Sequence, residues 1–505
     1  MVSRHWAGEL RVMRSHRSPH GRECMAQNNH SNSITLSKIK NRTAKVGIIG
    51  LGYVGLPLAL AFSEKFQVLG YDADPKKRKM LRQGRSYIDD VPSSELKEKL
   101  GTNLKVIEKD SQLRECDCII ICVPTPLDER GNPDLSYVQH SADLVRKVVR
   151  KGMLVVLEST SYPGTTDEFL GKAIKDAGFK PGKDVALAFS PERVDPGNKK
   201  YNIRNTPKVV GGEDAQSAEL ATALYSSIVE AGVVIMPDCA SAEAVKILEN
   251  IFRGVNIALI NEMALIFERM GIDTWQVVKA ASTKPFGFMP HYPGPGVGGH
   301  CIPLDPLYMS YRAKQYGFVP RFIELSHEVN EFMKNHTVNL TMAALKKAGV
   351  PADKATVAVM GLSYKKDISD TRESPAAGII EELTKRVKRV IAHDPKASAI
   401  KTHVGVVKSV PMRSAMDQAD CLVFVTDHSE FAALTPKGLR GKRVKAVVDT
   451  RNLFSREAAE HVGLVYRGSG SRLSPLAIVG LVRLGVLEFV ATRFVLGLMT
   501  TFIIH

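Results

Sequence analysis

The stretch Val46-Gly-Ile-Ile-Gly-Leu-Gly-Tyr-Val-Gly55 decides the fold of the first part of this chain. A short apolar run, typical of a buried strand, leads into the pattern Gly50-x-Gly52-x-x-Gly55, and a helical pattern continues through Phe62. The glycines permit a tight turn, the approach of a pyrophosphate and close helix packing, while the helix N-terminus offers its amides to the phosphates. The sequence therefore predicts a dinucleotide site with contacts from Gly50, Gly52, Tyr53, Val54 and Gly55.

An acidic residue at the end of the next apolar run favours NAD as the dinucleotide. Asp72 closes the run that begins at Val68 and follows the fingerprint by about 20 residues. Its carboxylate suits the adenosine ribose hydroxyls and repels a 2′-phosphate, although Lys77 nearby weakens this preference. A flavin or nucleotide site without redox chemistry is the alternative that these residues leave open.

Strand-like and helical patterns alternate along most of the chain. Apolar runs at 118–123 and 154–157 alternate with helical patterns, which indicates a parallel α/β sheet. A long helical pattern, Ala242–Met270, precedes a second α/β region that begins near Thr356. We expect an α/β protein with two Rossmann-like doubly wound domains, joined by a central helical domain with a long connecting helix. The expected parts are a disordered basic leader (1–43), an NAD-binding domain (44–236), a central dimerisation domain with a cysteine loop (237–335), a C-terminal α/β domain (336–467) and an atypical apolar tail (468–505).

Composition restricts the class of protein. The chain has 505 residues, 44% of them hydrophobic, and a formal net charge of +16. A basic balance suits an anionic small substrate, and no nucleic-acid-binding motif appears, so we expect no nucleic-acid partner. The seven cysteines form no CxxC pair, which favours a reducing, cytoplasmic location.

The C-terminal tail is unusually apolar. Residues 474–504 are interrupted by Arg483, Glu488 and Arg493, and central charges cost a membrane span about 2.5–3.5 kcal/mol each. We therefore do not expect a membrane span. A helix that contacts a membrane surface or a partner, and a tail that is not native, are the alternatives.

A glycine-rich loop carries a candidate nucleophile. The run Gly294-Pro-Gly-Val-Gly-Gly-His-Cys-Ile-Pro-Leu-Asp305 places Cys301 among glycines and four residues before a carboxylate. A thiolate adds readily to an aldehyde, and the resulting thiohemiacetal is a good hydride donor. Together with the dinucleotide fingerprint, this loop predicts an oxidation that passes through a covalent thioester. A buried structural cysteine is the alternative, and His300 could be a base or a substrate contact.

Two further pairs of polar residues are candidates for the site. Lys246 and Asn250 are spaced i, i+4 on one helix face, where they could stabilise an oxyanion and orient a water or could form a solvated surface. Glu192 follows an apolar run and could act as a base or position water. Arg193 beside it could pair with phosphates or lie at the surface.

A charged loop in the second α/β region is a third candidate. It spans residues 363–375, where Lys365 could reach substrate and Arg372 could reach cofactor. Taken alone, this loop is also typical of solvated surface. We expect no metal site.

Together these motifs strongly resemble the UDP-glucose/GDP-mannose dehydrogenase family over roughly residues 45–467. The resemblance implies an N-terminal NAD-binding domain, a central helical dimerisation domain, a C-terminal domain that binds the UDP part, and at least a homodimer. The matched motifs, in order, are the fingerprint at 50–55, Val123-Pro-Thr-Pro126, Glu158-Ser-Thr160, Ser190-Pro-Glu192, Lys246-x-x-x-Asn250, Gly298-Gly-His-Cys301 and Tyr364-Lys-Lys-Asp through Arg372.

The resemblance also implies a role for each matched residue. The nucleophile is Cys301, and the residues that handle the oxyanion, the water and the thioester complete a catalytic set of Cys301, Lys246, Asn250, Asp305, Glu192 and Thr160. The implied cofactor contacts beyond the glycine loop are Asp72, Lys77, Thr125 and Arg372. The implied substrate contacts are Glu192, Arg193, Lys246, Gly298, Lys365 and Arg451.

The implied reaction oxidises the C6 alcohol of a UDP-sugar twice with NAD and ends in a UDP-uronate. The runs Glu192-Arg-Val-Asp-Pro-Gly-Asn and His300-Cys-Ile-Pro-Leu-Asp-Pro resemble the branch that acts on UDP-N-acetylglucosamine. Members that act on UDP-glucose usually have Lys where Leu304 stands. UDP-N-acetylmannosamine and UDP-glucose stay as alternatives. A two-electron hydroxyacid dehydrogenase would need no Cys301, and a non-catalytic sugar-nucleotide-binding scaffold would form no NADH.

Overall fold

The computed structural model describes residues 30–471, apart from residues 89, 196 and 199. Residues 1–29 and 472–505 lie outside the described residues. Most of the expected leader, and the expected apolar tail beyond residue 471, therefore fall outside them as well.

The expected disordered leader is wrong over its last part, because α1 (His30–Lys40) is a helix. Lys38 pairs with Asp117 at 2.8 Å, Ile39 is buried, and Thr35 donates a hydrogen bond to a backbone carbonyl of the first domain. The segment is mostly polar and has no clear apolar face, so its pattern does not predict a helix. Contacts with the first domain stabilise it instead.

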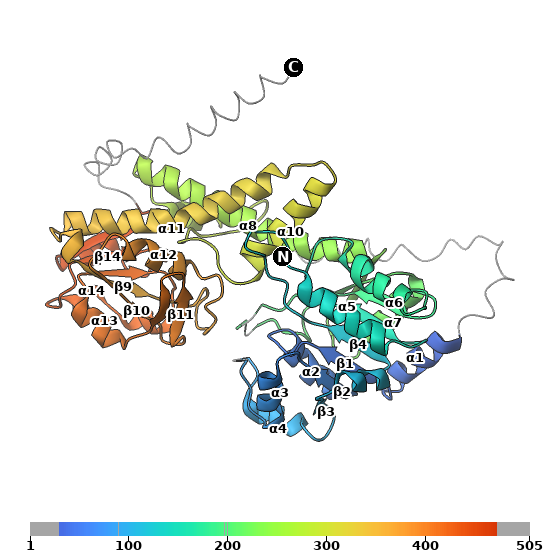
Figure 1. Cartoon of the computed structure of the whole chain (residues 1–505). Helices are drawn as coiled ribbons and strands as arrows, with labels where there is room; N and C mark the ends of the chain where they lie inside the picture. The colour runs from blue at the N-terminus through green and yellow to red at the C-terminus, as the bar shows by residue number, and fades with distance from the viewer. Residues whose placement is uncertain (1–29, 89, 196, 199, 472–505) are drawn as a thin grey trace, which may run out of the picture.

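The first domain is one eight-stranded sheet with helices on both faces (Figure 1). Its spatial order is β3-β2-β1-β4-β5-β6-β7-β8. The strand runs predicted at the fingerprint and at 118–123 and 154–157 are confirmed within two residues, because strands buried on both faces read as continuous apolar runs. The strands are β1 (Lys45–Ile49), β2 (Gln67–Tyr71), β3 (Leu104–Val106), β4 (Cys118–Ile121), β5 (Leu154–Leu157), β6 (Ala186–Phe189), β7 (Lys208–Gly212) and β8 (Val233–Met236).

Side chains alternate between the two faces of this sheet. On β4, Cys118 and Ile120 enter one core cluster and Ile119 and Ile121 enter the other. The covering helices are α2 (Gly55–Ser63), α3 (Pro75–Arg82), α4 (Ser93–Lys99), α5 (Ser136–Val148), α6 (Lys172–Asp176) and α7 (Ala215–Tyr225), with the 3-10 helix η2 (Asp110–Glu115) and the π-helix η3 (Thr166–Gly171).

One strand of this sheet runs against its neighbour. All adjacent pairs are parallel except β6 and β7, in which Phe189 lies opposite Gly211. The first residue of β7, Lys208, therefore lies at the edge where β4, β5 and β6 end. Ligands of open α/β sheets bind outside this edge, so the reversal brings Lys208 into the region of a site.

Long helices join the two α/β domains. α8 (Cys239–Met270) starts after the cap residue Asp238 and ends at Gly271, whose φ of +71° favours glycine. It confirms the predicted long helix and packs against α10 (Cys301–Gln315) and α11 (Arg321–Lys347) (Figure 1). The short α9 (Thr274–Ala281) follows α8 in the sequence. Within the described ranges, α8 is the one helix with the length and composition of a membrane span, which is weak evidence because core helices share both.

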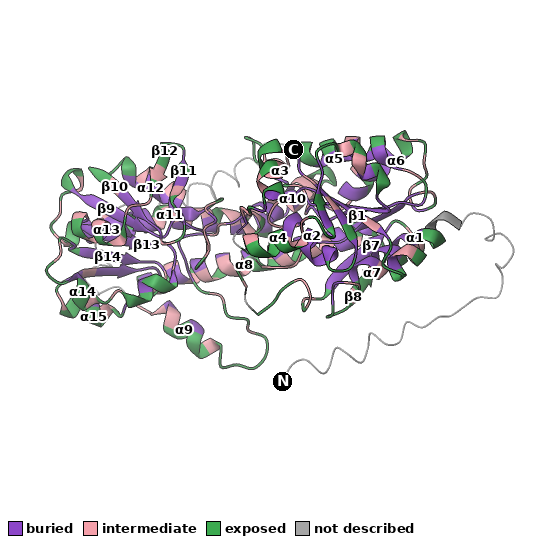
Figure 2. Cartoon of the chain, turned by 90° about the horizontal axis from the view of Figure 1, so that it is seen from below, coloured by how far each residue is buried: buried purple, intermediate pink, exposed green. Residues whose placement is uncertain are grey.

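The second α/β domain is a smaller parallel sheet in the order β10-β9-β13-β14-β15, and its three central strands are fully buried (Figure 2). Its strands are β9 (Thr356–Met360), β10 (Arg389–His393), β13 (Cys421–Phe424), β14 (Ala446–Asp449) and β15 (Val465–Gly468), beside the hairpin β11 (Ala399–Thr402) and β12 (Gly405–Lys408). Its helices are α12 (Pro375–Thr384), α13 (Met412–Gln418), α14 (Pro436–Leu439) and α15 (Arg456–His461), with 3-10 helices η4 (Ala352–Lys354) and η5 (Ser429–Ala433).

The turn after the first strand is built in the same way in both domains. Asp72 accepts a hydrogen bond from the backbone N–H of Leu51 at 2.9 Å, and Asp394 accepts one from Leu362 at 2.6 Å. The second domain lacks the later glycines of the fingerprint. The two domains are therefore both Rossmann-like, and the sequence prediction of that fold is confirmed.

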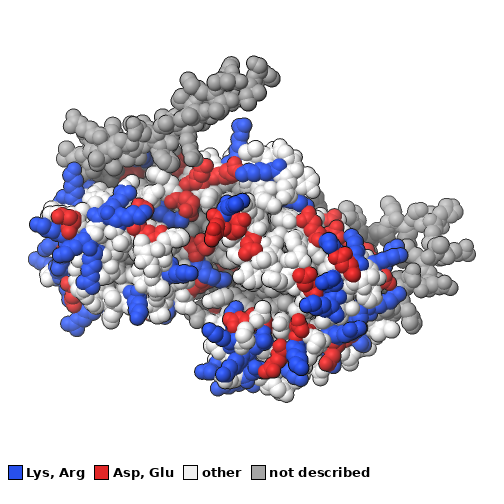
Figure 3. Space-filling model, viewed as in Figure 1, with Lys and Arg blue, Asp and Glu red and all other residues white. Residues whose placement is uncertain are grey.

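Charge is mixed over the surface. On the face drawn in Figure 3, Lys and Arg side chains are interspersed with Asp and Glu. A mixed surface of this kind offers no single broad basic field on that face.

Candidate active site

The glycine loop after β1 is shaped to receive a pyrophosphate. Gly50 has φ +89°, and a Cβ on it would lie 2.5 Å from the Cys122 carbonyl oxygen. A Cβ on Gly55 would lie 1.8 Å from the Gly50 oxygen, so helix α2 starts directly on the turn. No atom lies within 4 Å of the position of a Cβ on Gly52, which leaves open space before the helix N-terminus. This cradle fits a dinucleotide.

Asp72 lies beside this cradle and contacts its backbone. It is buried at the end of β2 and accepts hydrogen bonds from the backbone N–H groups of Leu51 and Asp74, both at 2.9 Å. Lys77 lies 4.0 Å away from its carboxylate. The aspartate is thus fixed in orientation and can present its carboxylate to ribose hydroxyls.

The candidate nucleophile begins helix α10 and lies against the second α/β domain. Cys301 is solvent-accessible on one side. A Cβ on Gly298 would lie 2.7 Å from the Cβ of Tyr364, and the N–H of Gly299 donates to the Arg372 carbonyl at 3.1 Å. The glycines therefore allow the loop 363–375 to approach the cysteine loop closely.

Helices α8 and α10 bring a polar cluster together beside Cys301. The amide of Asn250 donates to the carboxylate of Asp305 at 2.5 Å, and both residues are buried. Burial raises the pKa of Asp305 to about 7, against the opposing effects of Lys246 and Asn250. Burial and the Asp305 charge raise the pKa of Cys301 to about 11, and Lys246, Arg372 and Arg253 act against this rise. The predicted pair Lys246 and Asn250 thus lies in a polar cluster with Asp305 rather than on a fully solvated helix face.

A second polar cluster lies at the ends of β5 and β6. The ammonium group of Lys208 lies 3.1 Å from Glu158 and 3.2 Å from Glu192. Burial opposes ionisation of Glu192, but Lys208, the Val194 N–H and Lys246 outweigh it and hold its pKa below the usual value. Glu192 is thus a carboxylate at neutral pH.

The second α/β domain adds three cationic side chains. The guanidinium of Arg372 lies 4.6 Å from the centre of the Tyr53 ring, so it reaches the glycine loop of the first domain. Lys365 pairs with Asp195 at 2.7 Å across the two domains. Arg451 donates to the Val425 carbonyl at 2.8 Å and lies under Gly294 of the cysteine loop.

The other predicted residues lie around these clusters. Thr125 is buried after β4 and its carbonyl accepts a hydrogen bond from Tyr308, while Thr160 is partly exposed after β5. Arg193 pairs with Glu249 at 2.6 Å, so it is tied to α8. The Nε2 atom of His300 is buried and has no hydrogen-bond partner in the described part of the protein.

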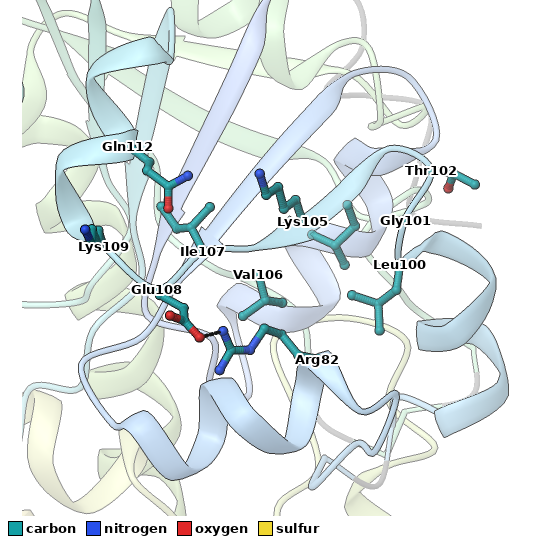
Figure 4. Close-up of a pocket in the computed structure, with 11 residues that line it drawn as sticks. Arg82, Leu100, Gly101, Thr102, Lys105, Val106, Ile107, Glu108, Lys109 and Gln112 are labelled. Carbon is teal, nitrogen blue, oxygen red and sulfur yellow. Dashed lines mark hydrogen bonds and ion pairs between the residues drawn. The ribbon is translucent and has the colours of Figure 1, made fainter.

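Sequence patterns missed two members of this region. Lys208 lies in Asn-Thr-Pro-Lys, a sequence typical of a surface turn. Its position at the edge where β5 and β6 end follows only from the antiparallel pairing of β6 and β7. Arg253 lies one turn beyond Asn250 on α8, a spacing that would have indicated it. A surface depression beside β3, lined by residues that include Arg82, Val106 and Glu108, contains none of the predicted site residues (Figure 4).

Comparison with known proteins agrees with this geometry. Three domains of one family match in order: the NAD binding domain at residues 44–229, the central domain at 240–332 and the UDP binding domain at 358–456. The chain belongs to the UDP-glucose/GDP-mannose dehydrogenase family. It is an NAD-dependent oxidoreductase that acts on a UDP-sugar.

The names of the proteins and solved structures that resemble this chain include more than one substrate sugar. The chain is 37% identical to a UDP-N-acetyl-D-glucosamine 6-dehydrogenase of Pseudomonas aeruginosa, over 82% of this chain and 98% of that protein. It is 36% identical to a UDP-N-acetyl-D-mannosamine dehydrogenase of Pyrococcus horikoshii, over 84% and 99%. A solved UDP-D-ManNAc dehydrogenase structure from Pyrococcus horikoshii has a TM-score of 0.78 at 34% identity, over 84% of this chain and 99% of that one.

Proposed function

We propose that this protein oxidises the C6 alcohol of UDP-N-acetylglucosamine to the UDP-uronate through a thioester on Cys301. The observation that carries the proposal is the cluster of Cys301, Asp305, Asn250 and Lys246 beside a dinucleotide cradle. A two-electron dehydrogenase has no use for an accessible thiol at this position. UDP-N-acetylmannosamine is the alternative substrate, because relatives of both names align over nearly their full lengths.

The polar cluster supplies the groups that the first oxidation needs. Asp305, with its pKa raised to about 7, can take a proton from the C6 hydroxyl near neutral pH. The Lys246 ammonium group stabilises negative charge that develops on the C6 oxygen, and Asn250 holds Asp305 in place. NAD held at the cradle would supply the hydride acceptor for C6. Because each NAD takes up one hydride, a second NAD would replace the NADH before the thiohemiacetal is oxidised.

Cys301 joins the two oxidations. Its sulfur bonds to C6 of the aldehyde and gives up its proton, and the C6 oxygen becomes the thiohemiacetal hydroxyl. After the second oxidation, C6 is a thioester. Water then attacks C6 while Glu192 accepts its proton, the C–S bond breaks, and the thiol and the UDP-uronate are formed.

Residues at the cradle and in the second domain position the two ligands. We assign Gly50, Gly52, Tyr53, Val54, Gly55, Asp72, Lys77, Thr125 and Arg372 to NAD. The UDP-sugar contacts in this proposal are Glu192, Arg193, Lys246, Gly298, Lys365 and Arg451. Thr160 helps to hold the attacking water. Lys365 pairs with Asp195 in this structure. This ion pair must break when Lys365 binds the diphosphate of the substrate.

We propose a cytoplasmic homodimer, or a larger assembly built from it, that forms through α8. This helix exposes Leu248, Phe252, Leu259, Ile266 and Met270, and an uncovered apolar face of this extent favours a partner surface. Substitution of Phe252 by Arg would convert the dimer to monomer in light scattering. A wild-type monomer at micromolar concentration would contradict this proposal.

The decisive experiment measures NADH at 340 nm with purified protein, NAD and each UDP-sugar separately. We expect two NADH per UDP-N-acetylglucosamine consumed and little NADH with UDP-glucose or UDP-N-acetylmannosamine. Another preferred sugar would overturn the substrate assignment alone. Cys301→Ala would abolish uronate formation and keep NAD binding, and full turnover by this variant would refute the thioester.

A further inference from the structure

A buried lysine connects two carboxylates at the edge of the site. The side chain of Lys208 is 4% exposed, and those of Glu158 and Glu192 are 0% and 14% exposed. Its ammonium group contacts both carboxylates and lies 5.1 Å from the centre of the Tyr225 ring. Tyr225 donates a hydrogen bond of 2.5 Å to the same Glu158 oxygen that Lys208 contacts. None of the reaction steps proposed above uses Lys208, Glu158 or Tyr225.

The fold fixes this arrangement through the reversed strand. Phe189 lies opposite Gly211 in the antiparallel pair of β6 and β7. Each step forward from β6 corresponds to one step back along β7, so the same register extended past Phe189 sets Glu192 opposite Lys208. Glu158 follows β5, the next strand in the sheet. Three neighbouring strands therefore deliver one cation and two anions to one place.

The charges in this cluster do not balance. One ammonium group faces two carboxylates, and a second oxygen of Glu158 is buried without a hydrogen-bond partner among the described residues. Burial raises the pKa of Glu158, although Lys208 opposes this, whereas the pKa of Glu192 is lowered. A buried carboxylate keeps its charge only where a partner compensates for the lost water. Lys208 is the cation in direct contact with Glu192, and Lys246 acts in the same direction.

We propose that Lys208 is a positioning residue that holds Glu192 as an oriented carboxylate for thioester hydrolysis, and that Glu158 competes with Glu192 for its charge. This inference rests on the proposed function. In the hydrolysis step Glu192 takes one proton from the attacking water while the Cys301–C6 bond breaks. Lys208 contacts neither the substrate nor the sulfur and exchanges no proton.

Other charged groups face Glu192 and keep their effect in every variant. Lys246 of α8 lowers its pKa, and the N–H groups of Arg193 and Val194 donate to it at 2.8 and 2.6 Å. The guanidinium of Arg193 points to Glu249 of α8. Directly after β4, the Cys122 thiol faces the charges of Glu158 and Glu192. These groups are common to wild type and variants, so a ratio of rates removes their contribution.

The test compares thioester hydrolysis in wild type, Lys208→Met, Lys208→Arg and Glu158→Gln. Acid-quenched samples analysed by intact-protein mass spectrometry give the amount of Cys301 adduct against time from pH 4 to 9, a range that reaches the lowered pKa of Glu192. Lys208→Met keeps an unbranched side chain that is one atom shorter and removes its charge. We expect adduct to accumulate, hydrolysis at pH 7 to slow by about ten- to hundredfold, and the first two NADH to appear at a rate close to wild type. Lys208→Arg retains the charge and restores most of the rate.

The pH dependence separates positioning from simple loss of structure. The hydrolysis rate of Lys208→Met divided by that of wild type should rise with pH, because Glu192 without its cation ionises only at higher pH. The same ratio for Glu158→Gln should instead be highest at the lowest pH. In that variant Lys208 pairs with Glu192 alone, so the pKa of Glu192 falls and Glu192 stays ionised at lower pH. The titration of Asp305 cancels in both ratios.

Different failures have different meanings. Wild type that forms no adduct and no NADH with any UDP-sugar refutes the proposed function. Normal wild type with ratios that do not change with pH in either variant refutes the role of Lys208. If Lys208→Met does not fold, the test rests on Glu158→Gln. A ratio of hydrolysis rates, Glu158→Gln to wild type, that does not change with pH then overturns the inference.

Discussion

Two glycines in the same fingerprint should respond in opposite ways to the same substitution. A Cβ on Gly55 would overlap the Gly50 oxygen at 1.8 Å and lie 3.1 Å from the Cys122 side chain. A Cβ on Gly52 would meet nothing within 4 Å. Gly55→Ala therefore tests the packing of the empty protein, and Gly52→Ala tests the space that the pyrophosphate needs.

The size of each effect follows from these contacts. Relief of the Gly55 overlap requires the turn to move by more than 1 Å, and overpacking of this kind costs about 1–3 kcal/mol. For a domain of this size, a cost of about 2 kcal/mol lowers Tm by roughly 4–8 °C. Gly52→Ala should change stability by about 0.5 kcal/mol or less. Its methyl group should displace the pyrophosphate from at least one amide, which costs about 1.5–3 kcal/mol and raises Kd about ten- to hundredfold.

Thermal unfolding by circular dichroism and NAD titration by calorimetry measure the two quantities. We expect Gly55→Ala to lose stability without NAD present, and Gly52→Ala to lose NAD affinity at an unchanged Tm. A Gly52→Ala protein that binds NAD as wild type does would refute the open cradle. An equal fall in Tm for both variants would refute the distinction between the two positions.

Two further predictions concern ionisable groups. Asp305→Asn removes a charge that raises the pKa of Cys301, so the pH midpoint of iodoacetamide alkylation should fall below that of wild type; an unchanged midpoint would contradict the coupling. Burial opposes ionisation of Asp394, but His428 and backbone N–H groups hold its pKa well below the usual value. The ionised carboxylate therefore stabilises the fold at pH values above its pKa in the unfolded chain. This stabilisation is lost as the pH falls toward the pKa in the folded protein. Asp394→Asn should therefore lower Tm at pH 7 more than at pH 3.

The sequence predicted most of the fold because buried parallel strands are visible as apolar runs. The fingerprint, Asp72 and the long helix before Met270 are all local patterns, and each was predicted from within about 30 residues. The pattern did not reveal α11 or α1. Polar and apolar residues are mixed around the surfaces of both helices. Contacts with distant parts of the chain stabilise them, and a local sequence pattern does not contain those contacts.

The candidate site was predictable where one motif holds several of its members. Cys301 and Asp305 lie in one sequence motif at the start of α10, and Lys246 and Asn250 lie one helical turn apart on α8. The contact of Asn250 with Asp305 joins residues 55 positions apart, and only the packing of α8 on α10 brings them together. Lys208 was not predictable, because its place depends on the direction of one strand and not on its neighbours in sequence.

The reversed strand also governs which changes in length this protein can tolerate. Glu192 and Lys208 lie near the two ends of the segment that joins β6 to β7. Insertions between these two residues therefore leave the positions of both charges unchanged. A single-residue insertion inside β6 or β7 would shift the pairing by one position and turn Lys208 toward the opposite face of the sheet. Natural length variation should therefore gather between these two residues and be rare within the strands that carry them.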